Sequence, residues 1–136
     1  MKILALDIGD RWIGVAISDP LGILPRPYDT CKASELITFL EKTIQKENIA
    51  TIVVGLPTTL SGTESDQTKK VISLTDELKT LFPAIDWQLW DERLTSKQAA
   101  NIRSTRTKED KLRSHAIAAA LILSGYLERR RISLDS

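Results

Sequence analysis

The chain has 136 residues, of which 42% are hydrophobic, and 19 Lys or Arg stand against 18 Asp or Glu. This length predicts one domain, residues 1–136, and is short for a protein of two lobes. The single cysteine, Cys31, excludes an internal disulfide, and the longest apolar run, residues 116–123, is too short to cross a bilayer. We therefore expect a cytoplasmic protein without a membrane segment.

The charge is unevenly distributed along the chain. Residues 1–92 hold 9 Lys or Arg against 14 Asp or Glu, a net charge of −5, whereas residues 93–136 hold 10 against 4, a net charge of +6. A basic final third beside an acidic remainder suits a phosphate-rich partner held over a carboxylate site. Solvated surface charge with no partner is the alternative.

The first element, residues 3–19, is a nearly continuous apolar run interrupted by Asp7. Such a run predicts a strand covered on both faces, and Gly9 then allows a turn into a second, antiparallel strand over residues 13–17. Because an unpaired carboxylate is costly in a buried strand, we expect Asp7 near the strand end. Capping the turn is its alternative role.

The next elements alternate between strands and helices. Pro25 and Pro27 predict an edge strand that ends near Cys31, since proline cannot donate to a ladder. Ser34 can cap a helix that ends near Asn48. Further along, the pattern predicts a buried strand at 51–54, a helix that Pro83 stops, a strand at 85–90, a short helix from about 95 to 102, a mobile loop at 103–113 and a last helix over about 114–130.

This order of elements predicts an α/β fold. Three antiparallel strands followed by parallel crossovers give a mixed five-stranded sheet flanked by helices on both faces, which is the ribonuclease H-like arrangement. In such sheets functional groups gather at the strand ends, where Asp7 and the pair Asp91 and Glu92 fall. Since side chains alternate, one member of the pair can approach Asp7. Two converging carboxylates suit Mg²⁺ or Mn²⁺, although pairing with Arg93 or capping the next helix would also explain the acidic pair.

Several motifs in order resemble those of the YqgF/RuvX family of ribonuclease H-like nucleases. They are Asp7-Ile8-Gly9 with Arg11, Ile13-Gly14-Val15-Ala16 with Ser18-Asp19, Val54-Gly55-Leu56-Pro57 with Gly62 and Thr63, Asp91-Glu92-Arg93-Leu94-Thr95, and Ala119 to Leu123 with Tyr126-Leu127. The resemblance implies a metal-dependent nuclease with Asp7 and Glu92 in its acidic site. It also implies maturation of the 5′ end of small-subunit ribosomal RNA precursor or, by fold kinship, Holliday junction resolution.

His115 departs from the family pattern, which usually places an aspartate at this point of the last helix. Asp110 is a poor substitute, because five helical residues turn its side chain by about 140° from His115. Three interpretations of His115 stay open: a catalytic metal ligand or proton shuttle, a residue that packs at the helix start, or the mark of reduced activity. Neutral imidazole is a poor ligand for Mg²⁺ but acceptable to Mn²⁺.

Basic residues precede the last helix and are candidates for phosphate contacts. We assign nucleic-acid binding to Arg11, Arg93, Arg103, Arg106, Lys108, Lys111 and Arg113. By contrast, we expect Arg129, Arg130 and Arg131 to form a solvated end of the last helix. Trp87 and Trp90 should lie on opposite faces of their strand, so at least one belongs to the core.

The sequence thus favours a metal-dependent endonuclease acting on structured nucleic acid. A nucleic-acid-binding protein that does not cleave is the second hypothesis, and a fragment of an actin-like ATPase is the third, because its first loop is loosely similar. The choice between ribosomal RNA precursor and branched DNA stays open, as does the choice between monomer and homodimer.

Overall fold

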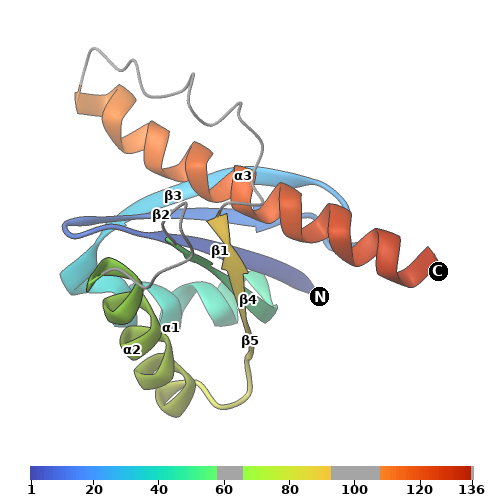
Figure 1. Cartoon of the computed structure of the whole chain (residues 1–136), viewed down its shortest axis with the longest axis horizontal. Helices are drawn as coiled ribbons and strands as arrows, with labels where there is room; N and C mark the ends of the chain where they lie inside the picture. Colours follow the sequence, from blue (N-terminus) through green and yellow to red (C-terminus); the bar gives the residue numbers. More distant parts are fainter. Residues whose placement is uncertain (58–65, 93–107, 136) are drawn as a thin grey trace.

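The computed structural model describes residues 1–57, 66–92 and 108–135 (Figure 1). The predicted helix at 95–102, residues 103–107 of the predicted loop at 103–113, and Gly62 and Thr63 lie outside these residues. The described elements are β1 (Lys2–Ile8), β2 (Trp12–Ser18), β3 (Pro25–Lys32), η1 (Ala33–Glu35), α1 (Leu36–Glu47), β4 (Ile49–Leu56), α2 (Asp66–Leu81), β5 (Asp86–Asp91) and α3 (Lys108–Asp135).

The strands form one mixed sheet in the order β3-β2-β1-β4-β5. β1 pairs with β2 and β2 with β3 in antiparallel fashion, whereas β4 is parallel to both β1 and β5. The α/β sheet with helices on both faces is therefore confirmed, and the strand that contains Pro25 and Pro27 lies at the edge. This order places the carboxyl ends of β1, β4 and β5 side by side.

The sheet has a hydrophobic layer on each face, with α1 and α2 on one side and α3 on the other (Figure 1). One face packs against α1 and α2 through residues such as Leu6, Val54 and Leu40. The other face packs against α3 through smaller residues, among them Ala5 and Ala16. Because β-strand side chains alternate between faces, Ile3 and Ala5 in the α3 layer put Asp7 on that same face of β1. The last helix therefore covers the acidic end of the first strand.

Two local predictions about helix starts are wrong. Ser34 does not cap a helix, because the chain leaves β3 through the 3₁₀ turn η1, and α1 begins after Glu35 with no side-chain capping bond. The last helix begins at Lys108 instead of about residue 114. Its first residues are mostly Lys, Glu and Arg, which favour helix intrinsically, so a helix can extend there without apolar periodicity. The predicted end of α1 is confirmed, since Asn48 adopts a left-handed conformation with φ 56°.

Among the described helices, none is long and apolar enough to span a membrane.

Candidate functional site

A single lateral row of residues crosses the sheet beneath α3. Thr30 of β3 pairs with Gly14 of β2, and Gly14 pairs with Asp7 of β1. On the other side of β1, Leu6 pairs with Val54 of the parallel strand β4. The next residues along the two strands, Asp7 and Gly55, therefore lie side by side. Gly55 in turn pairs with Trp90 of β5. Asp7 is therefore flanked by glycines on both neighbouring strands, which leaves room above them on the α3 face.

Glu92 occupies part of the room above Gly55. A Cβ atom built on Gly55 would lie 2.8 Å from Glu92 Oε1 and 2.5 Å from Cδ1 of Ile122 in α3. The carboxylate of Glu92 thus lies over the strand next to Asp7, on the face that both Asp7 and α3 occupy. Asp91 is aligned with Leu56 on β4, and Leu56 packs into the opposite hydrophobic layer. Of the two adjacent acids, Glu92 is the one that extends to the face of Asp7.

His115 reaches the same row from above. A Cβ atom on Gly14 would lie 1.9 Å from the carbonyl oxygen of His115 and 2.9 Å from the backbone nitrogen of Ala116. The backbone of α3 therefore rests directly on Gly14, the cross-strand partner of Asp7. Opposed residues in antiparallel strands have Cα atoms only about 4.5–5.5 Å apart. His115 lies about two turns inside α3, so it is not at the helix start.

A hydrogen bond fixes this part of α3 on the sheet. The hydroxyl of Thr30 donates to the carbonyl oxygen of Leu112 at 2.6 Å. Leu112 is one turn before His115, so Thr30 and Gly14 set the height and position of the helix over adjacent strands. A glycine inside a strand pattern is the sequence signal of such a close backbone approach, although it does not name the partner.

The loops around the acidic end are also connected to one another. The side-chain amide of Gln67 in α2 donates to the carbonyl of Ile8 at 3.3 Å, and the hydroxyl of Thr68 donates to the carbonyl of Pro57. The β1–β2 turn is closed by the amide of Gly9, which donates to the Trp12 carbonyl at 3.0 Å. The ends of β1 and β4 are thereby held to the start of α2.

The predicted nucleic-acid contacts fall into three groups. Arg11 and Arg113 are exposed, and Arg113 lines a shallow hollow of about 310 Å³ between α3 and the edge strand β3. Lys108 and Lys111 belong to α3 and not to a loop, but their side chains are outside the described part. The remaining predicted contacts, Arg93, Arg103 and Arg106, lie outside the described residues. A cation at the start of α3 therefore stands beside the helix segment that covers Asp7.

The tryptophans of β5 alternate as predicted. Trp90 is buried under α3, where its ring meets Tyr126 edge-on at a centroid distance of 6.2 Å, and Trp87 packs beside Phe82 on the other face. Trp90 is therefore a core residue and does not offer a surface for base stacking.

The carboxylates of this site suit a hard divalent cation whose coordination shell is completed by the substrate. Within the described part of the chain, no three His, Cys, Asp or Glu side chains are close enough to hold a metal by themselves. Asp7 and Glu92 present carboxylate groups on the same face of the sheet. Mg²⁺ is usually bound by one or two carboxylates together with water and substrate phosphates, so two carboxylates suffice for such a site.

The comparison with known proteins decides the family. The family model of RuvX, described as Holliday junction resolvase, matches residues 1–129. The chain belongs to the RuvX family. Two RuvX relatives named "Putative pre-16S rRNA nuclease" come from Rubrobacter xylanophilus, at 38% identity over 93% of this chain and 92% of the relative, and from Koribacter versatilis, at 41% over 98% and 91%. The resemblance inferred from the motifs is thus confirmed.

Solved structures support the fold of this RuvX member. Thermus thermophilus RuvC in complex with Holliday junction substrate aligns with a TM-score of 0.59 at 12% identity, covering 96% of each chain. A second structure of RuvC from the same organism gives a TM-score of 0.58 at 14% identity. At these identities the similarity establishes a shared ribonuclease H-like fold.

The substitution Gly55→Ala tests whether cleavage depends on the position of Glu92 separately from the stability of the fold. The added methyl group meets two flexible side chains, with Ile122 Cδ1 and Glu92 Oε1 as the nearest atoms, so both must move aside. We expect a loss of stability of about 1–2 kcal/mol and, because a misplacement of about 1 Å can cost 10²-fold in rate, a roughly 100-fold loss of cleavage. Thermal denaturation and a cleavage assay measure the two effects.

A second substitution serves as the control for Gly55→Ala. Ile122→Val removes the Cδ1 atom that the new methyl group would contact. The double variant should regain stability and stay impaired in cleavage. Recovery of both properties together would show that the position of Glu92 is unimportant.

Proposed function

We propose that this RuvX family member is a divalent-metal-dependent endonuclease that cleaves phosphodiester bonds in structured nucleic acid, with the 5′ end of small-subunit ribosomal RNA precursor as its substrate. The observation that carries the proposal is the Glu92 carboxylate over Gly55, in the row of residues that contains Asp7. The names of the relatives favour the RNA substrate. A substrate of this kind supports a cytoplasmic location, which we include in the proposal.

In this proposal Asp7, near the end of β1, and Glu92, directly after β5, would hold Mg²⁺ or Mn²⁺. With a divalent ion held by Asp7 and Glu92, the site would have the chemistry to activate a water and to stabilise the leaving oxygen of a phosphodiester. Arg113 and the other cations near the start of α3 position the phosphates flanking the scissile bond, without reading the sequence. His115, whose backbone rests beside Asp7, acts as a further ligand or moves a proton.

The test compares two substrates with one protein preparation. Ribosomal RNA precursor and a four-way DNA junction are incubated with the purified protein in Mg²⁺, in Mn²⁺ and in EDTA. We expect a defined cut in the RNA that requires a divalent ion. Binding of either substrate without cleavage under all conditions would instead support the hypothesis of a non-cleaving binding protein.

The family description provides the second candidate function, resolution of a Holliday junction. Symmetric resolution needs two active sites and therefore a homodimer, whereas trimming of an RNA end needs only a monomer. Paired, symmetric cuts in the four-way junction, together with a dimer in sedimentation equilibrium, would favour this candidate over the RNA substrate.

The choice of metal tests the role of His115. If the imidazole is a ligand, Mn²⁺ should support faster cleavage than Mg²⁺, because nitrogen ligands suit Mn²⁺ better. His115→Ala should then remove the advantage of Mn²⁺, and His115→Asp should shift the preference toward Mg²⁺. Equal rates with both ions, in the parent protein and in His115→Ala alike, would exclude a ligand role.

A further inference from the structure

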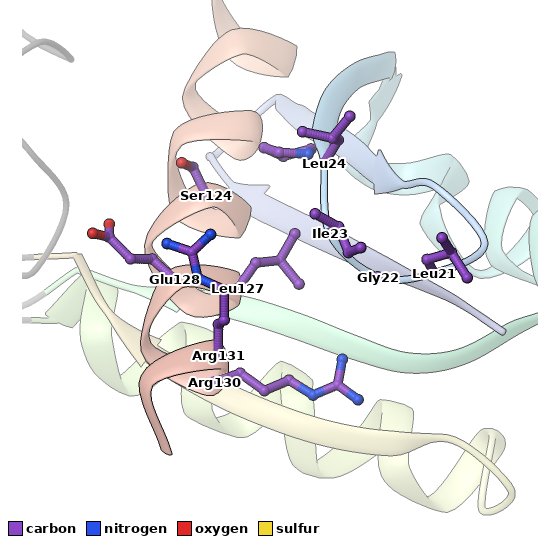
Figure 2. Close-up of a pocket in the computed structure, with 10 residues that line it drawn as sticks. Leu21, Gly22, Ile23, Leu24, Ser124, Leu127, Glu128, Arg130 and Arg131 are labelled. Carbon is purple, nitrogen blue, oxygen red and sulfur yellow. The ribbon is translucent and has the colours of Figure 1, made fainter. Parts of the chain in front are cut away.

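A second hollow lies at the far end of α3 from the acidic site. It has a volume of about 370 Å³, within the range of small-ligand pockets, and it lies between the C-terminal half of α3 and the β2–β3 turn (Figure 2). The turn follows Ser18, which lies beside the start of β1, whereas Asp7 lies near the end of β1. The hollow and Asp7 are therefore at opposite ends of this strand. Along α3, Leu127 and Arg131 of this hollow are about 18 Å and 24 Å beyond His115.

The turn that forms one wall is rigid and apolar. The Asp19 carboxylate accepts hydrogen bonds from the amides of Leu24 at 2.8 Å and Ile23 at 2.7 Å, which hold the pKa of Asp19 below its usual range. Leu21, Ile23 and Leu24 nevertheless expose 78%, 55% and 67% of their surface. Three exposed aliphatic residues on a fixed turn are typical of a binding surface, because little order is lost on binding.

The opposite wall is cationic. Arg130 and Arg131 line the hollow, and among the described residues Glu128 is the only acidic one that does so. Figure 2 shows Arg131 running along the helix and Arg130 extending toward the turn. A Cβ atom on Gly22 would lie 3.2 Å from Nη1 of Arg130, so this guanidinium reaches the turn itself. Planar guanidinium groups both bind phosphate and stack on bases.

We propose that this hollow binds an unpaired nucleotide of the RNA substrate, with its base against the aliphatic turn and its phosphates on Arg130 and Arg131. The inference rests on the proposed function and adds a second contact to it. The positive charge of this wall favours a polyanion over a second copy of the chain, whose own arginines would face one another. At about 3.4 Å per stacked nucleotide, 18–24 Å corresponds to five to seven nucleotides between the hollow and the acidic site.

The test measures RNA binding separately from cleavage. Fluorescent RNA hairpins carry single-stranded 5′ or 3′ extensions of 0, 4, 8 and 12 nucleotides, and their affinities are measured by anisotropy in EDTA. We expect affinity to rise about tenfold between 4 and 8 nucleotides for one polarity, since stacking and phosphate contacts add there. The same affinity for all lengths and both polarities would overturn the proposal.

Matched variants identify the hollow as the cause of that rise. Arg130→Ala with Arg131→Ala should abolish it and reduce the slope of log K against log salt by about 1.4, for two lost phosphate contacts. Arg129→Ala, which removes an equally exposed charge that does not line the hollow, should retain the rise. Ile23→Ser should weaken only the longer probes. An equal loss in the double arginine variant and in Arg129→Ala would show unspecific charge and refute the proposal.

Two further measurements distinguish the remaining possibilities. Cleavage of the same hairpins in Mg²⁺ tests the nuclease activity: cleavage without the length-dependent rise refutes only the hollow, and the rise without cleavage refutes only the nuclease. Sedimentation equilibrium tests self-association. A dimer that Ile23→Ser dissociates, with RNA affinity unchanged, would assign the hollow to a second copy of the chain and overturn the nucleotide site.

Discussion

Asp7→Asn and Glu92→Gln should each lower the cleavage rate by about 10³-fold while leaving the fold intact. Both substitutions keep side-chain size but remove a negative charge from the pair proposed to hold the divalent ion. Electrostatic stabilisation by a bound metal supplies several kcal/mol to the transition state, and each 1.36 kcal/mol is a factor of ten in rate. Single-turnover cleavage of the RNA precursor measures the loss, and circular dichroism confirms the fold.

Asp91→Asn is the matched control for these two substitutions. It makes the same chemical change one residue away from Glu92, at a position aligned with Leu56, on the strand face opposite Asp7. We expect less than a threefold change in rate. Cleavage that survives both Asp7→Asn and Glu92→Gln would exclude the proposed site, and a severe defect in Asp91→Asn would show that the wrong member of the pair has been chosen.

The strands and their faces could be predicted because their signal is local. A buried strand interrupted by one carboxylate, a glycine turn and an alternating second strand define the hairpin around Asp7. Prolines identify β3 as the edge strand for the same local reason, since they lack a donor. The alternation that separates Asp91 from Glu92 follows from strand geometry alone, and the structure shows which of the two lies over Gly55.

The start of α3 could not be predicted because its cause is tertiary. Residues 108–113 are polar and lack apolar periodicity, and what holds the helix there is Thr30, 82 positions earlier, which bonds the carbonyl of Leu112. Ser34 gave a capping signal, but the chain enters α1 through a 3₁₀ turn. In both places the path of the chain in three dimensions overrides a local preference.

The acidic residues of the candidate site could be predicted from the sequence, but the residues that support them could not. Asp7 and Glu92 are conspicuous because charge is costly beside buried strands. Gly14 and Gly55 appeared only as parts of a motif, since a missing side chain does not reveal what fills its place. In the structure the α3 backbone lies over Gly14, and the Glu92 carboxylate lies with Ile122 over Gly55.

Gly14→Ala should destabilise the protein far more than Gly55→Ala. Its methyl group would lie 1.9 Å from the carbonyl oxygen of His115 and 2.9 Å from the backbone nitrogen of Ala116, which cannot rotate away as a side chain does. The helix itself must lift from β2. We expect a loss of about 3 kcal/mol or more, which lowers the melting temperature by about 10 °C in a domain of this size.

Thr30→Val is the control for Gly14→Ala, because it loosens the attachment of α3 without introducing a steric clash. It removes the hydrogen bond to Leu112 at nearly constant volume, and the expected cost is about 1 kcal/mol. Because Gly14 is the cross-strand partner of Asp7, lifting the helix also moves His115 away from the acidic row. Gly14→Ala should therefore lose cleavage even at temperatures where it stays folded. A folded Gly14→Ala variant with the parent's activity would mean that cleavage does not depend on how closely α3 approaches Asp7.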